Sequence, residues 1–117
     1  MPAMHDFSIT MCDHTIQVKT KVWLEINGHR LFGEGRAQLF RQIRETSSIN
    51  ASAKVMGISV RRAWGMVKDM EDTLGIILVE KRRGGIGGGM TILTPAALEL
   101  LERYDTILKK YKTLTTP

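Results

Sequence analysis

The stretch that decides the fold is SINASAKVMGISVRRAWGMVKDM, residues 48–70, in which two helical patterns flank a glycine. Ser48 is typical of a helix N-cap, and Gly57 favours the left-handed backbone at a helix C-terminus, so a short helix is expected between them. Ser59 is a second N-cap, and apolar residues recur after it at three- and four-residue spacing. The segment therefore predicts a short helix, a tight turn and a longer helix over about 60–74.

Upstream, the pattern predicts a helix over about 36–45 and, before it, a hairpin. Residues 16–26 alternate between apolar and polar side chains, as in a half-buried strand, and Asn27-Gly28 favours a type I′ turn. A two-residue turn sets the register of the two strands. The expected cross-strand pairs are Leu24 with Leu31, Glu25 with Arg30, and Trp23 with Phe32.

Downstream, two strand patterns at 76–82 and 90–93 flank the glycine-rich loop of residues 84–89. Thr94-Pro95 reads as an N-cap followed by proline at the first helical position, so a final helix of about 95–113 is expected. Residues 1–15 show no sustained periodicity. They are expected to form a flexible N-terminal arm, which leaves residues 16–117 as one domain.

The order of these elements is that of a winged helix-turn-helix. We therefore expect a mainly α fold with small β-hairpins: a winged helix-turn-helix with an N-terminal hairpin and a long C-terminal helix. The length of 117 residues favours one domain, and the ordinary apolar and charged content excludes disorder. Neither a membrane-spanning run nor a signal peptide is apparent, and the single cysteine, Cys12, fits a reducing compartment.

The net charge is +5, which favours an anionic partner such as nucleic acid. Arginine in the first turn of the longer helix could bind guanine in the major groove, while helix N-termini and a basic wing suit phosphates. We therefore expect binding to double-stranded DNA, with a recognition helix of about 59–74 and a wing of 82–89. The candidate DNA-binding residues are Ser48, Ser59, Arg61, Arg62, Lys68, Lys81, Arg82, Arg83, Gly85 and Gly87.

These features also allow other interpretations. The arginines could form an ordinary solvated face, and the fold could serve as a protein–protein interaction module. Nucleotide binding by the glycine run of residues 84–89 is not expected, because the run lacks the lysine of a P-loop and the spacing of a dinucleotide fingerprint. His5, Cys12 and His14 lack the usual metal-ligand spacing, although a small metal- or oxyanion-binding protein stays an alternative. We expect no catalytic site, no cofactor and no bound metal.

The final helix is the expected dimer interface, because its apolar face is wider than one small domain needs. The alternative is that this helix packs wholly on its own domain. The interface residues recur at four- and three-residue spacing and are Leu101, Tyr104, Leu108 and Tyr111.

The chain from Lys21 to about Leu114 resembles the N-terminal DNA-binding domain of ModE-type molybdate-responsive transcription regulators, a LysR-like winged helix. The resemblance rests on WLEINGHRLFGEGR (23–36), SINASAKVMGIS (48–59), RRAWGMVKDM (61–70), LGIILVEKRRGGIGGG (74–89) and LTPAAL (93–98). It implies a dimeric, cytoplasmic transcription regulator and adds Val60 to the DNA-contacting residues. These 117 residues are not expected to contain a molybdate-binding domain, so any effector stays unknown.

Overall fold

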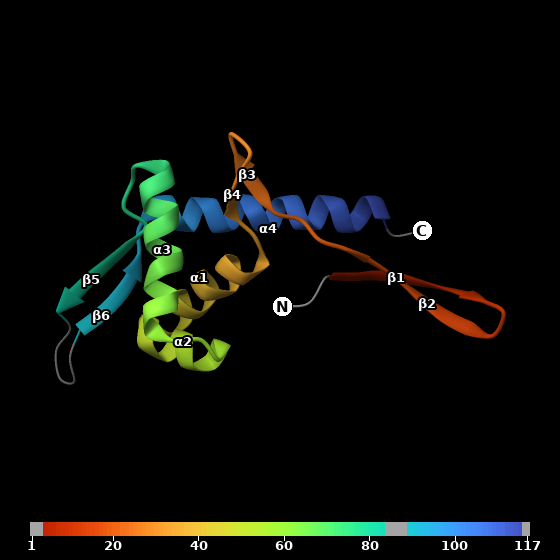
Figure 1. The fold of residues 1–117 in the computed structure, drawn as a ribbon, viewed down its shortest axis with the longest axis horizontal. Coiled ribbons are helices and arrows are strands. Elements are labelled where there is room, and N and C mark those ends of the chain that lie inside the picture. Colours follow the sequence, from red (N-terminus) through yellow and green to blue (C-terminus); the bar gives the residue numbers. More distant parts are fainter. Residues whose placement is uncertain (1–3, 84–88, 116–117) are drawn as a thin grey trace.

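The computed structural model describes residues 4–83 and 89–115, with side chains over 8–83 and 89–112. Three antiparallel hairpins and four helices make up this part of the chain. The elements are β1 (Met4–Met11), β2 (His14–Thr20), β3 (Leu24–Ile26), β4 (His29–Phe32), α1 (Glu34–Thr46), α2 (Ile49–Met56), α3 (Val60–Leu74), β5 (Val79–Arg83), β6 (Gly89–Leu93) and α4 (Pro95–Thr115). The mainly α winged helix-turn-helix is confirmed (Figure 1).

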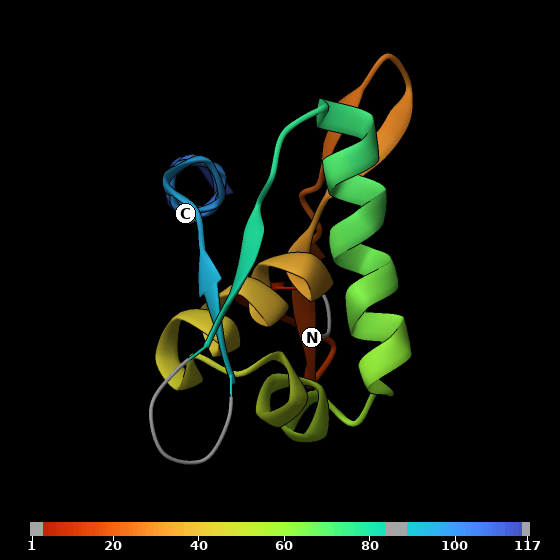
Figure 2. The ribbon, with the colours of Figure 1, turned by 90° about the vertical axis from the view of Figure 1, so that its left-hand side faces the viewer.

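One core holds the four helices together. The ring of Phe32 lies 5.4 Å from Phe40 and 5.2 Å from Tyr104, so β4, α1 and α4 meet there. The expected apolar stripe of α1 is buried, as is the inner face of α3. α3 and α4 lie on opposite sides of the body, with β5–β6 between them (Figure 2). This arrangement leaves the outer face of α3 uncovered.

The helix-turn-helix follows the predicted boundaries because its caps are encoded locally. The Ser48 hydroxyl accepts a hydrogen bond from the Ala51 amide at 3.0 Å, and the Ser59 hydroxyl accepts one from the Arg62 amide at 3.0 Å. Gly57 ends α2 with φ of 69° in the left-handed region, which glycine adopts without strain. α1 begins two residues earlier than predicted, at Glu34.

The N-terminal region differs from the prediction. Residues 1–15 were expected to be an irregular arm, but β1 pairs with β2 through a turn at Cys12 and Asp13, whose φ values are 50° and 61°. The predicted strand of 16–26 is divided, because no strand pairing runs between Thr20 and Leu24. The hairpin extends away from the helical body (Figure 1) and exposes Ile9, Met11 and Ile16.

The β3–β4 register agrees with the prediction only near the turn. Asn27 and Gly28 both have positive φ, as a type I′ turn requires, and Glu25 pairs with Arg30. The expected pairs of Leu24 with Leu31 and of Trp23 with Phe32 are wrong. An irregularity between Leu24 and Glu25 shifts the register by one residue, so Leu24 pairs with Phe32.

The wing is shorter at its base than predicted. Residues 76–78 do not belong to β5, because β6 ends at Leu93, whose partner is Val79. The Thr94 side chain instead donates to the Ile77 carbonyl at 2.8 Å, and the Thr94 amide donates to the Leu78 carbonyl at 3.0 Å. These bonds satisfy backbone groups at the point where strand pairing stops.

The assignment of the final helix to a dimer interface needs correction. Thr94 caps α4 as predicted, accepting from the Ala97 amide at 3.3 Å. Leu101 and Tyr104, however, are 0% and 1% exposed within their own domain. Leu108 is half-buried against the same core, while Tyr111 is 51% exposed. The amphipathic pattern of α4 is therefore explained largely by packing inside one protomer.

Candidate nucleic-acid interface

The first turn of α3 presents the predicted recognition residues to solvent. The Ser59 cap fixes where the helix begins, and Val60, Arg61 and Arg62 follow it on exposed positions. Among the ion pairs of the described side chains, none involves Arg61 or Arg62. Two guanidinium groups at a helix start are thus available to an external acceptor.

Backbone hydrogen bonds fix the wing to the helix-turn-helix. The Thr91 amide on β6 donates to the Ser47 carbonyl at 2.9 Å, and the Thr91 hydroxyl accepts from the Ile49 amide at 3.2 Å. On the other strand, one carboxylate oxygen of Glu71 accepts from the Leu78 and Val79 amides at 2.8 and 3.2 Å. These bonds hold the described part of the wing at a set position beside α3.

Trp64 links α3 to the wing. Its ring is half-buried, and the Lys81 ammonium lies 4.7 Å from the ring centroid. The two side chains border a hollow of about 250 Å³, which Ser48 and Asn50 also line. Sequence reasoning missed Asn50, whose only signal is its position in the first turn of a capped helix.

The other predicted DNA-binding residues differ in whether their charges are already paired with acidic side chains. The Lys68 ammonium lies 3.5 Å from Asp72, and an Arg82 guanidinium nitrogen lies 3.5 Å from Glu80; both pairs are exposed, where ion pairs contribute little. Arg83 is exposed at the end of β5. Gly85 and Gly87 lie outside the described residues.

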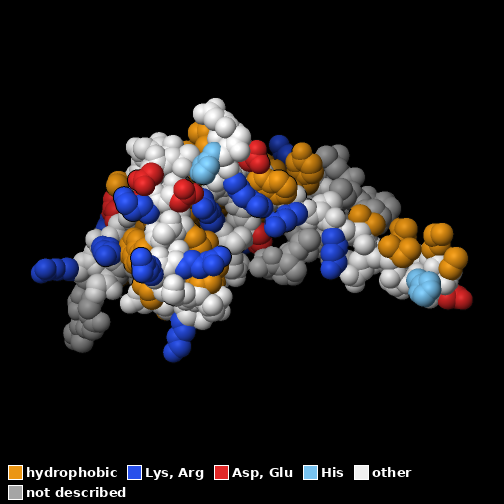
Figure 3. Space-filling view, in the orientation of Figure 1, with side chains coloured by type: hydrophobic (Ala, Val, Ile, Leu, Met, Phe, Trp, Pro, Cys, Tyr) orange, Lys and Arg blue, Asp and Glu red, His pale blue; other side chains and the backbone are white. Residues whose placement is uncertain are grey.

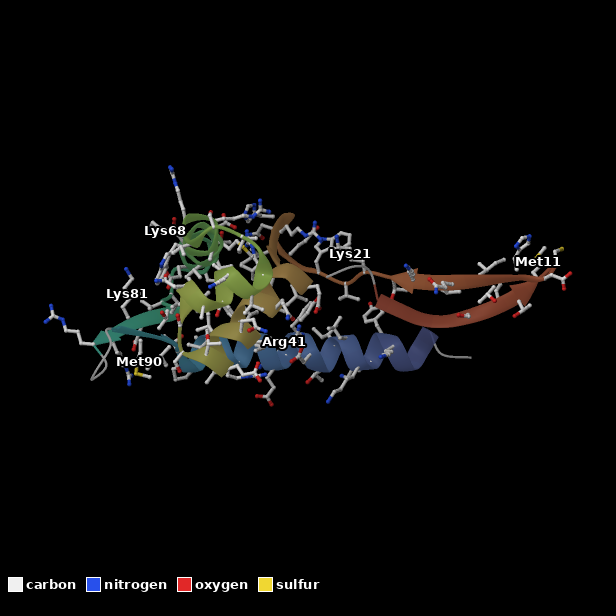
Figure 4. All side chains as sticks on the ribbon, turned by 90° about the horizontal axis from the view of Figure 1, so that it is seen from below. Met11, Lys21, Arg41, Lys68, Lys81 and Met90 are labelled. Carbon is white, nitrogen blue, oxygen red and sulfur yellow. The ribbon has the colours of Figure 1, made fainter. Side chains whose placement is uncertain are left out.

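Positive charge gathers on the face that carries α3. Lys and Arg side chains spread over it from the wing toward the start of the N-terminal hairpin (Figure 3). Lys21 and Lys68 both lie on the side of the molecule away from α4 (Figure 4). A surface of this shape and charge suits the phosphate backbone of a duplex that receives α3 in its groove.

The described part of the chain offers no candidate for a metal site, a paired cysteine or a membrane-spanning helix. It contains no group of three His, Cys, Asp or Glu side chains placed to hold a metal ion. Cys12, at the exposed tip of the β1–β2 hairpin, has its thiol free. Of the helices that the structure describes, none is both long and apolar enough to cross a membrane.

Fold and surface together define a winged helix-turn-helix of the DNA-binding class. Residues 35–98 match the family described as bacterial regulatory helix-turn-helix protein, lysR family, and the chain belongs to that family. Its DNA-binding domain is of the ModE type.

Three curated relatives illustrate this similarity. The chain is 42% identical over 79 residues to the transcriptional regulator ModE of Yersinia pestis. It is 38% identical over 86 residues to the molybdenum-pterin-binding protein MopB of Rhodobacter capsulatus, and 37% identical over 79 residues to the DNA-binding transcriptional dual regulator ModE of Escherichia coli K12. The alignments cover 67%, 74% and 67% of this chain but only 30%, 32% and 30% of the relatives.

Proposed function

We propose that this protein is a sequence-specific DNA-binding transcription regulator that acts in the cytoplasm by binding rather than by catalysis. The observation that carries the proposal is the first turn of α3, where Arg61 and Arg62 are exposed and form no ion pair with the side chains that the structure describes, beside a wing fixed by hydrogen bonds. Membership of a family of regulatory helix-turn-helix proteins supports the same function.

The chemistry of DNA indicates which residues bind bases and which bind phosphates. A guanidinium can bind the O6 and N7 atoms of guanine together, so Arg61 and Arg62 are assigned to base recognition. Lys81 and Arg83 on the wing are assigned to phosphates, which position the protein without reading sequence. Ser48 and Ser59 begin helices whose positive N-terminal ends favour phosphate oxygens.

We propose in addition that the protein acts as a homodimer. With Leu101 and Tyr104 buried, the surface assigned to the partner copy is the second half of α4, where Leu108 is half-buried and Tyr111 is exposed. This half extends beyond the helical body, beside the β1–β2 hairpin (Figure 1). A two-fold axis there would present two α3 helices to half-sites about one helical turn, or a multiple of it, apart.

Sedimentation tests the dimer. A species of about twice 13.2 kDa is expected at micromolar concentration, and Leu108→Glu should shift it toward monomer. Because Leu108 also touches the core, the circular dichroism of the variant must match that of the wild type. A wild-type monomer that protects a palindromic site at full affinity would exclude this part of the proposal.

Selection of genomic fragments tests the central function. The full chain should enrich a defined set of fragments that share a short motif, and the Arg61→Ala, Arg62→Ala double variant should not. Repeating the selection with molybdate examines the effector of the molybdate-responsive regulators that the sequence resembles. Enrichment no better than that of random fragments, from a folded protein, would contradict sequence-specific binding.

A further inference from the structure

A second basic site lies beside α3, on the side opposite the wing. It is an open groove of about 420 Å³ between β4, the start of α1 and the start of α3. We call it the basic groove and define it by its four cationic side chains, Lys21, Arg30, Arg36 and Arg62. Of these, only Arg62 was predicted from the sequence to contact DNA.

The cations of the basic groove come from four separate segments that only the fold brings together. Lys21 precedes β3, Arg30 lies on β4, and Arg36 lies in the first turn of α1. Arg62 lies in the first turn of α3. Like charges gathered in this way repel one another, so a site of this kind favours an anion that relieves the repulsion.

The one acidic side chain among the described residues that line the groove is already neutralised. One oxygen of Glu34 lies 2.8 Å from an Arg41 nitrogen, and the other lies 3.4 Å from the Tyr104 hydroxyl. The Glu34 side chain is only 11% exposed. Its charge is directed toward the interior and does not compete with an anion in the groove.

Two of the four cations are held in position. Arg36 pairs with Asp69 at 2.8 Å and donates to the Leu31 carbonyl at 2.7 Å, so its charge is largely compensated. The Arg30 guanidinium lies over the Trp23 ring, 4.5 Å from its centroid, a contact that orients the group without neutralising it. The ring is itself oriented by a 2.7 Å bond from its N–H to Glu25.

The other two cations are free to meet a ligand. Among the described ion pairs, none involves Lys21, Arg30 or Arg62. Lys21 and Arg62 are exposed, and the groove lining includes Gly35, where an added Cβ would meet nothing within 4 Å. An anion can therefore approach this part of the lining without steric obstruction.

The position of the groove identifies the anion. Successive residues project about 100° apart around a helix, so Arg62 and Trp64 point to opposite sides of α3. Trp64 faces the wing, and Arg62 lines the basic groove. A helix in the major groove has a phosphate backbone on each side of it, about 12 Å apart. We propose that the wing meets one backbone and that the basic groove binds phosphates of the other through Lys21 and Arg30, which leaves Arg62 to the bases.

This inference rests on the proposed function and extends the interface to the N-terminal segment. Its test measures the affinity of the full chain for a selected duplex and for a scrambled duplex over a range of NaCl concentrations. The variants are Lys21→Ala and the double change Lys21→Ala, Arg30→Gln. The matched control is Arg103→Ala, which removes one exposed charge from the first half of α4, away from the proposed dimer surface.

The proposal predicts a uniform loss of affinity. Removing one cation that binds a phosphate should reduce the slope of log K against log salt by about 0.9, so for each bound protomer the single variant loses about 0.9 and the double variant about 1.8. Selected and scrambled duplexes should weaken by the same factor, because phosphates carry no sequence information. Arg103→Ala should leave the slope unchanged.

Unchanged slopes in both groove variants would overturn the proposal while leaving the proposed function intact, provided that wild type still prefers the selected duplex. If wild type shows no such preference, the proposed function fails first. A free oxyanion is the other source of the same chemistry. Inorganic phosphate that raises the Tm of wild type but not of Lys21→Glu, with DNA salt slopes unchanged, would overturn the assignment to DNA.

Discussion

Tyr104→Phe removes a single hydroxyl that joins the segment before β3 to α4. The side chain is 1% exposed, and its hydroxyl donates to the Val22 carbonyl at 2.9 Å. An intramolecular hydrogen bond contributes about 0.5–1.5 kcal/mol net, and leaving the carbonyl of half-buried Val22 without this partner adds to the loss. The variant should therefore unfold with a free energy about 1–2 kcal/mol below that of wild type at pH 8.

The same hydroxyl should make this difference depend on pH. Burial, with the nearby Glu34 carboxylate adding to it, raises the pKa of Tyr104 to about 12. In the unfolded chain a tyrosine ionises near pH 10, so above that pH the unfolded state loses a proton that the folded state keeps. Wild-type stability must then fall as pH rises, by about 1.4 kcal/mol at pH 11, whereas phenylalanine at this position does not titrate.

Urea unfolding of both proteins at pH 8, 10 and 11 measures the difference directly. The other titrating groups are shared, so their contributions cancel when the two free energies of unfolding are subtracted. The gap of about 1–2 kcal/mol at pH 8 should nearly close by pH 11. If the difference in free energy of unfolding stays constant from pH 8 to pH 11, the hydroxyl of Tyr104 does not have a raised pKa. If there is no difference at pH 8, its hydrogen bond does not stabilise the fold.

Three further changes test packing around α3. Trp64→Ala should lower the free energy of unfolding by about 2 kcal/mol in thermal melts, less than the 3–5 kcal/mol of a fully buried tryptophan, because the ring is half-buried. Gly65→Ala should raise the free energy of unfolding by about 0.5–1 kcal/mol, because an added Cβ meets nothing within 4 Å and alanine favours the helix. A lower free energy of unfolding would show that the added methyl group clashes. Glu71→Ala should cost about 2–3 kcal/mol by freeing two wing amides, while its exposed neighbour Asp72→Ala should change stability by less than about 0.5 kcal/mol.

The helix-turn-helix could be predicted from sequence because its signals are local. A serine cap, a helical repeat and a glycine stop each act within a few residues, and Ser48, Gly57 and Ser59 hold the positions that the sequence indicates. The same holds for the type I′ turn at Asn27-Gly28. The apolar positions of α3 face the core, so Arg61 and Arg62, which lie off that face, are exposed as predicted.

The features that sequence could not predict depend on contacts between distant segments. Periodicity shows that α4 has an apolar face but not what covers it, and only the fold brings Tyr104 against Phe32 and the Val22 carbonyl. The basic groove joins Lys21 and Arg30, for which the sequence predicted no contact with DNA, to Arg62 from a distant segment. The alternation of residues 16–26 indicated a strand that includes most of β2, but residues 1–15 carry no sustained periodicity that would indicate its partner, β1.

The role of the first turn of α3 is tested most directly by comparing how strongly the protein prefers its selected duplex over a scrambled one. The preference is measured at fixed salt for wild type and for the Arg61→Ala, Arg62→Ala double variant. Removing one arginine that binds a base should reduce the preference by about 1–3 kcal/mol, or about 5- to 150-fold. A double variant with the wild-type preference would show that these arginines do not read sequence and that α3 is not the recognition helix.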